Sequence, residues 1–192
     1  MTITESLTTV LTMPTPDAIW RLRGDLLQQH QQIPPELAGL LTRFYNFLTE
    51  LKAKATAREF SHFASLLDMG AVGGVAVQNL MDAQANKENL WQRLLVGGLS
   101  EGLMVLAARQ YVKAWEGEMV SVYQEAGWHL YQTLWTLSVQ TQPQLDAATR
   151  RQMIETMLAP VYDTAVSGSI KAVLIARLYQ ILLVAYLEIY NP

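Results

Sequence analysis

The chain has 192 residues, of which 51% are hydrophobic and 16% are charged, and its net charge is −3. This length and apolar content suffice for one compact core, and the charged fraction lies below the roughly 25% typical of soluble domains. The absence of cysteine excludes disulfides, thiolate metal sites and cysteine nucleophiles. The basic residues are dispersed, which argues against nucleic-acid binding. The first residues do not resemble a secretory signal, so we expect a cytoplasmic protein.

The N-terminal part is predicted to begin with a short tail. Residues 1–14 are rich in threonine without a sustained period, which indicates a flexible N-terminal tail. Thr15 can cap a helix and Pro16 suits its first turn, so a helix is predicted over residues 16–32. Residues 15–192 are predicted to form a single all-helical domain.

The rest of the chain shows helical periodicity. A helix beginning near Pro35 carries apolar residues at the spacing of one buried face, namely Leu37, Leu40, Leu41, Phe44, Phe47, Leu48 and Leu51. A capping box at residues 56–59 starts another helix. Further helices are predicted over residues 86–115, 118–140 and 145–158. The last of these should stop near Pro160, and a final hydrophobic helix should reach almost to Tyr190. No alternating strand pattern persists, so we predict an all-α bundle of six or seven helices.

Small residues recur four positions apart in three of the predicted helices, in the pairs Gly70/Gly74, Gly98/Gly102 and Gly168/Ala172. Glycine in a helix interior costs about 1 kcal/mol relative to alanine, so a gain elsewhere should offset it. Small residues at this spacing let two helix axes approach closely. We therefore predict glycine-mediated close helix crossings within the bundle.

The hydrophobic last helix raises the question of a membrane. The segment is long enough to span a bilayer, but Lys171 and Arg177 interrupt the apolar run. A stable transmembrane span is therefore not expected. Insertion of this helix into a membrane after a conformational change is one alternative function.

Two Glu/His pairs have the spacing of side chains that share a helix face. They are Glu59 with His62 and Glu125 with His129, and a dimetal centre in a helix bundle uses such units pointing inward. Both pairs fall opposite the apolar stripe of their helices, so we predict solvated side chains, no metal site and no cofactor. The sequence also lacks a nucleophile elbow and a phosphate-binding loop. It offers no catalytic residues, and the balance is against an enzyme.

Two charged residues interrupt otherwise apolar helices. Glu101 lies in LLVGGLSEGLMVLAA and Arg177 lies in IKAVLIARLYQILLVAYL. A buried charge without a partner is costly, so we predict that Arg177 meets Glu101 or another acid across a helix interface. Arg177 and Gln180 share one stripe of the last helix, which either faces solvent or lines a polar pocket. In a pocket, they would orient the head group of an apolar or amphipathic small molecule bound between helices.

Aromatic residues form ridges beside the apolar stripes of two helices. One ridge consists of Trp128, Tyr131 and Trp135, and the other of Tyr179, Tyr186 and Tyr190. Such ridges belong to the core or, if exposed, form an association surface, since Trp and Tyr dominate interface hot spots. Together with the low charged fraction, they predict a non-enzymatic helical interaction or regulatory module. We expect it to act as a homo-oligomer or to bind a protein partner.

Overall fold

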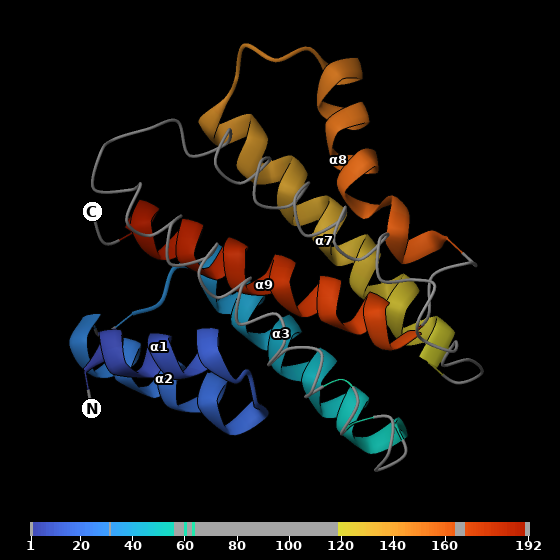
Figure 1. The fold of residues 1–192 in the computed structure, drawn as a ribbon. Coiled ribbons are helices and arrows are strands. Elements are labelled where there is room, and N and C mark those ends of the chain that lie inside the picture. Colours follow the sequence, from blue (N-terminus) through green and yellow to red (C-terminus); the bar gives the residue numbers. More distant parts are fainter. Residues whose placement is uncertain are drawn as a thin grey trace.

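The computed structural model describes residues 2–30, 32–55, 60, 63, 119–163 and 168–190. These residues are helical and contain no strand, which confirms the prediction of an all-α bundle with a hydrophobic C-terminal helix. The helices in this part of the chain are α1 (Ile3–Thr12), α2 (Pro16–His30), α3 (Pro35–Lys54), α7 (Met119–Thr141), α8 (Ala147–Tyr162) and α9 (Gly168–Tyr190) (Figure 1). The predicted helix that starts at residue 86 lies outside the described residues, and of the one that starts at residue 56 only Phe60 and Phe63, both helical, are described.

Most of the N-terminal segment forms helix α1, so the prediction of a flexible tail was wrong. The Thr2 hydroxyl accepts a hydrogen bond from the Glu5 backbone N–H at 3.2 Å, and the Glu5 carboxylate accepts one from the Thr2 N–H at 2.8 Å. This capping box satisfies two N–H groups that a helix start leaves without partners. The inner face of α1 is buried through Ser6, Leu7, Val10 and Leu11. Capping and burial therefore outweigh the low helix propensity of threonine.

Helices α2 and α3 agree with their predictions. The Thr15 hydroxyl accepts a hydrogen bond from the Ala18 N–H at 3.1 Å, as expected of a capping residue. In α3, all seven residues of the predicted apolar face are buried. Two prolines, Pro34 and Pro35, separate the two helices and cannot donate backbone hydrogen bonds, so the chain turns there.

Helices α7 and α8 form a hairpin whose boundaries differ slightly from the prediction. The Asp146 carboxylate caps α8 by accepting from the Thr149 backbone N–H at 2.8 Å. Pro160 was predicted to stop this helix, but it is buried inside the helix, which ends at Tyr162. Proline removes one hydrogen bond of the ladder, and this loss is small when only two residues follow. The difference between the predicted and the observed end of α8 is therefore confined to its last turn.

Helix α9 runs through the middle of the described bundle (Figure 1) and packs against α3, α7 and α8. Helix α1 packs on α2, and α2 packs on α3. The direction of the colours shows that α3 runs antiparallel to both α7 and α9. Every residue from 172 to 186 is buried. The last helix of the chain is therefore its central core element.

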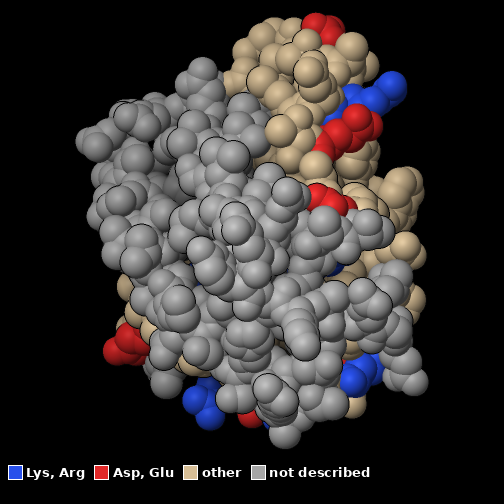
Figure 2. All heavy atoms as spheres, turned by 45° about the vertical axis from the view of Figure 1, so that its right-hand side comes forward, with Lys and Arg blue, Asp and Glu red and all other residues tan. Residues whose placement is uncertain are grey.

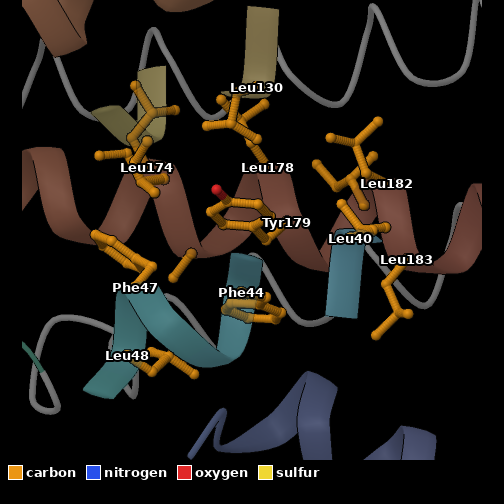
Figure 3. Packing of buried hydrophobic residues seen from close by; sticks show 14 of the residues in the cluster. Leu40, Phe44, Phe47, Leu48, Leu130, Leu174, Leu178, Tyr179, Leu182 and Leu183 are labelled. Carbon is orange, nitrogen blue, oxygen red and sulfur yellow. The ribbon is translucent and has the colours of Figure 1, made fainter. Parts of the chain in front are cut away.

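The centre of the core lies where α9 meets α3 and α7. The ring of Tyr179 stacks on Phe44 with centroids 5.0 Å apart, and it lies 6.1 Å from the ring of Phe47 (Figure 3). Leu130 of α7 lies on the other side of Tyr179 in this view. The stretch Lys171–Tyr190 is long and apolar enough to cross a membrane, with a mean hydropathy of 1.8, but 83% of its most apolar window is buried. Its place in the core explains its apolar sequence.

Glycine contributes to packing at a position outside the predicted pairs. The pairs Gly70/Gly74 and Gly98/Gly102 lie outside the described residues, whereas Gly168 and Ala172 are buried at the start of α9. On α7, a Cβ atom placed on Gly127 would lie 2.5 Å from the Tyr162 hydroxyl oxygen and 3.3 Å from Val161 Cγ1. The end of α8 thus approaches α7 at a distance that only glycine permits without a shift.

Candidate functional site

The polar stripe of α9 is buried, so the interpretation that it faces solvent was wrong. Arg177 is 2% exposed and Gln180 is fully buried. The Arg177 guanidinium donates from Nη1 to Gln180 Oε1 at 2.9 Å. Gln180 in turn donates from Nε2 to the carbonyl oxygens of Val10 and Leu11, at 3.0 and 3.3 Å. Gln180 is therefore engaged with the chain itself and does not point into an open pocket.

These contacts give the stripe a structural role. Val10 and Leu11 belong to the last turn of α1, whose carbonyl groups lack partners within the helix. Gln180 donates hydrogen bonds to two of these carbonyl groups and thereby holds α1 against the central helix. Glu101 lies outside the described residues, so its pairing with Arg177 stays a prediction.

Three aromatic rings form a continuous stack along α7, which we call the aromatic ladder. It consists of Trp128, Tyr131 and Trp135. Trp128 and Tyr131 have centroids 6.4 Å apart and planes 7° apart, and Tyr131 and Trp135 have centroids 6.3 Å apart and planes 14° apart. Trp128 is 57% exposed, whereas the other two rings are half-buried. The ladder therefore passes from solvent toward the core.

Arg150 of α8 closes the inner end of the aromatic ladder. Its guanidinium carbon lies 5.3 Å from the centre of the Trp135 ring, within the range of a cation–π contact. Nη2 of Arg150 also donates to the carbonyl oxygens of Gln142 and Leu145, at 2.9 and 3.1 Å. These bonds fix the α7–α8 connection and hold the guanidinium over the ring. The second predicted ridge differs, since Tyr179 and Tyr186 are buried in the core.

A small cavity of about 60 Å³ lies between α3 and α7, and we call it the α3–α7 cleft. Its lining comes from two matching stripes and a residue of α9, namely Arg43, Asn46, Phe47 and Glu50, Val122, Glu125, Ala126 and His129, and Tyr179. Each stripe has the spacing of neighbours on one helix face. Sequence reasoning missed this site because it could not tell that α3 and α7 pack together.

The Glu125/His129 pair lies at the rim of the α3–α7 cleft. Their side chains are 66% and 28% exposed, and His129 Nε2 lies 3.7 Å from Glu125 Oε1. The prediction of a solvated side chain is therefore confirmed for Glu125, whereas His129 is partly enclosed, with a buried Nδ1 that has no hydrogen-bond partner in the structure. Within the described ranges, no three His, Cys, Asp or Glu side chains come close enough to hold a metal ion.

A second cavity, of about 110 Å³, lies at the α2–α3 turn beside the end of α9. Its lining is mostly apolar and includes Leu26, Ile33, Leu37 and Leu187. The Tyr190 hydroxyl at its edge donates to Glu36 Oε2 at 2.9 Å. This cavity is separate from the residues that the sequence suggested for ligand binding, Arg177 and Gln180.

On the face shown in Figure 2, the coloured Lys, Arg, Asp and Glu side chains of the described residues are scattered and do not form a wide patch of one sign. The fold and these sites define the class as an all-helical bundle built around a buried C-terminal helix, with an aromatic ladder and a small polar cleft. No family model, no curated protein and no solved structure matches the chain.

Proposed function

We propose that this protein is a helical interaction module that associates through the aromatic ladder of α7. The observation that carries the proposal is the stack itself, in which Trp128 is 57% exposed and is backed by two half-buried rings. Single exposed apolar residues are ordinary on protein surfaces. A stacked Trp–Tyr–Trp series is different, because large rings that are already ordered lose little side-chain entropy on binding and are typical interface anchors.

A second copy of the chain is the partner that we propose. A two-fold interface uses the same surface on both subunits, and aromatic rings suit this arrangement because they stack on one another. Arg150 and Trp135 fix the inner end of the ladder, so Trp128 is presented on a rigid base. We further propose that the protein is soluble and cytoplasmic, in keeping with an apolar α9 whose side chains are used in the core.

The experiment measures molar mass by sedimentation across a wide concentration range. We expect reversible association of the wild-type protein, and Trp128→Ala should weaken it at least about tenfold because it removes a hot-spot side chain. Trp20→Ala is the matched control, since Trp20 is 61% exposed on α2 and lies outside the aromatic ladder. A wild-type protein that stays monomeric at all concentrations, or equal effects of the two variants, would contradict the proposal.

Two alternative functions are tested differently. An apolar or amphipathic small molecule would fit the apolar cavity near Leu26 and Leu187 better than the engaged Arg177/Gln180 pair. Mass spectrometry of an organic extract of the purified protein would detect such a ligand. Insertion of α9 into a membrane requires its release from the core, which liposome flotation across pH would reveal.

A further inference from the structure

The α3–α7 cleft contains polar groups that have no partner among the described residues. His129 lines the cleft, and its Nδ1 atom is buried without a hydrogen-bond partner among the described residues. Tyr179, which is 1% exposed, also lines the cleft. In Figure 3 its hydroxyl oxygen points away from α3, toward the side where α7 lies. A buried polar atom without a partner is costly. The position of His129 Nδ1 beside Tyr179 therefore indicates that a group bound in the cleft completes its hydrogen bonding.

Arg43 and the Tyr179 hydroxyl supply hydrogen-bond donors to the cleft. Arg43 forms no ion pair or hydrogen bond with any described residue, although it lies close enough to influence the charge state of Tyr179. His129 Nδ1 is buried and has no partner in the structure. A guanidinium offers five N–H donors, a phenol offers one O–H, and an imidazole nitrogen donates when it carries the proton. Arg43 can only donate, so it favours an acceptor that carries a negative charge, and the Tyr179 hydroxyl can donate to the same acceptor.

The acidic residues of the cleft already have basic neighbours. Glu50 Oε2 lies 3.8 Å from the Lys54 ammonium, and Glu125 Oε1 lies 3.7 Å from His129 Nε2. These contacts reduce the demand of both carboxylates for an added cation. The carboxylates nevertheless limit how much negative charge the cleft accepts, so a monoanion suits it better than a dianion such as phosphate.

The size of the cavity limits the choice of ligand further. The cavity of about 60 Å³ corresponds to the volume of roughly two water molecules in the liquid. A planar carboxylate group matches this size and also matches the fork of a guanidinium, which binds both oxygens at once. The rim residues Asn46 and Glu125 are exposed, so a short chain attached to the carboxylate can extend into solvent.

We propose that the α3–α7 cleft is a binding site for a small monocarboxylate, whose oxygens accept hydrogen bonds from Arg43 and Tyr179. Phe47, Val122 and Ala126 supply the apolar wall beside the short hydrocarbon part. This site is independent of the aromatic ladder, so either proposal can fail without the other.

The test is a side-chain NMR titration with acetate, in which sodium chloride is exchanged for sodium acetate at constant ionic strength. Acetate should shift the Tyr179 and His129 ring signals in a saturable manner. Acetamide has nearly the same shape without the charge, and it should leave both signals in place. Malonate, a dianion, should bind more weakly than acetate because of Glu50 and Glu125.

Variants link the signal to the cleft. Arg43→Gln should weaken acetate binding about tenfold, whereas Arg21→Gln, which alters an exposed arginine of α2, should leave it unchanged. Tyr179→Phe keeps the ring that stacks on Phe44 and should weaken binding several-fold while circular dichroism shows an intact fold. A shift that never saturates, an equal response to acetamide, or full binding by Arg43→Gln would overturn the proposal and leave water as the occupant of the cleft.

Discussion

Gln180 of α9 donates a hydrogen bond to the carbonyl oxygen of Val10 at 3.0 Å, although 170 residues separate the two in the chain. The bond joins the central helix α9 to the end of α1, although the two helices lie at opposite ends of the sequence. Gln180→Leu keeps the approximate shape and removes the amide, so the carbonyl groups of Val10 and Leu11 lose their donor and Arg177 loses its hydrogen bond to Gln180 Oε1. We expect a loss of about 1–3 kcal/mol in the free energy of unfolding. Urea denaturation would measure it.

The control for this prediction is Gln28→Leu, which changes an exposed glutamine of α2. Its effect should stay within about 0.5 kcal/mol. Hydrogen exchange adds a local readout, because the backbone amides of α1 should exchange faster in Gln180→Leu than in the wild-type protein. Unchanged unfolding and unchanged exchange in α1 would mean that Gln180 does not fasten this helix.

Gly127→Ala should reveal the close approach of α8 to α7. Alanine favours a helix by about 1 kcal/mol over glycine, but its Cβ would lie 2.5 Å from the Tyr162 hydroxyl oxygen and 2.9 Å from Tyr162 Cζ. We expect the Tyr162 ring to be displaced, and the cost of this displacement should cancel the gain in helix stability. In a Tyr162→Ala background the same substitution should stabilise the protein by about 1 kcal/mol more than in the wild type. A double-mutant cycle from thermal or chemical unfolding measures this difference, and additive effects would refute the contact.

Asp146 should make the start of α8 sensitive to acid. The Thr149 backbone N–H and hydroxyl donate to its carboxylate at 2.8 and 2.9 Å, and these hydrogen bonds lower the pKa of Asp146 from its usual value of 3.8. A lowered pKa stabilises the folded state above pH 3.8, and this stabilisation is lost as the pH falls through the lower folded-state pKa. NMR titration of the Thr149 amide should follow this loss.

The variant Asp146→Asn distinguishes the hydrogen bond of the cap from the charge of the carboxylate. Asparagine still accepts a hydrogen bond at the cap position, so α8 should begin at the same residue while the acid-dependent change of the Thr149 amide disappears. Asp146→Ala should remove both the cap and the pH dependence. An acid transition that persists in Asp146→Asn would assign it to another carboxyl group.

Tyr186 should ionise late when the protein is titrated with base. Burial is the main cause that raises the pKa of Tyr186 to about 12, and the neighbouring Tyr190 and Glu36 raise it further. The unfolded chain loses this proton near pH 10. The folded state therefore gains stability from the neutral phenol below pH 10, and this gain is lost as the pH rises from about 10 to about 12.

Absorbance at 295 nm would follow this ionisation. The chain has eight tyrosines, and exposed tyrosines should ionise first, whereas Tyr186 and the buried Tyr179 contribute to a later phase. Tyr186→Phe should reduce the amplitude of the late phase without shifting the early one. A single phase near pH 10 in a protein that circular dichroism shows to be folded would contradict the burial of these rings.

The periodicity of apolar residues predicted the helices well where one face of a helix is buried and the other is exposed to solvent. In α3 the spacing identified all seven buried residues, because an amphipathic helix carries this information in its own sequence. The tail prediction failed because four of the ten residues of α1 are threonine, which has a low helix propensity. Its stability depends on the Thr2/Glu5 cap and on Gln180, and the latter contact lies at the far end of the chain.

The candidate sites were predicted in part. The ridge Trp128, Tyr131 and Trp135 follows from helical spacing, so the sequence was enough to place these residues together. The α3–α7 cleft was not predictable in this way, because it requires two helices separated by more than sixty residues to pack side by side. Arg177 and Gln180 were correctly singled out as polar residues in an apolar helix, but the partners of Gln180 on α1 could not be read from the pattern.

The position of α9 has a consequence for the order of events during synthesis. The ribosome releases α1, α2, α3, α7 and α8 before it releases the helix around which the bundle is organised. The apolar faces of α3 and α7 then have no complete surface to cover them, which exposes the nascent chain to aggregation and to chaperones. Folding of the described bundle should therefore be completed only after translation has passed residue 190. A nonsense mutation ahead of Gly168 would remove the core of the bundle and leave its outer helices without support.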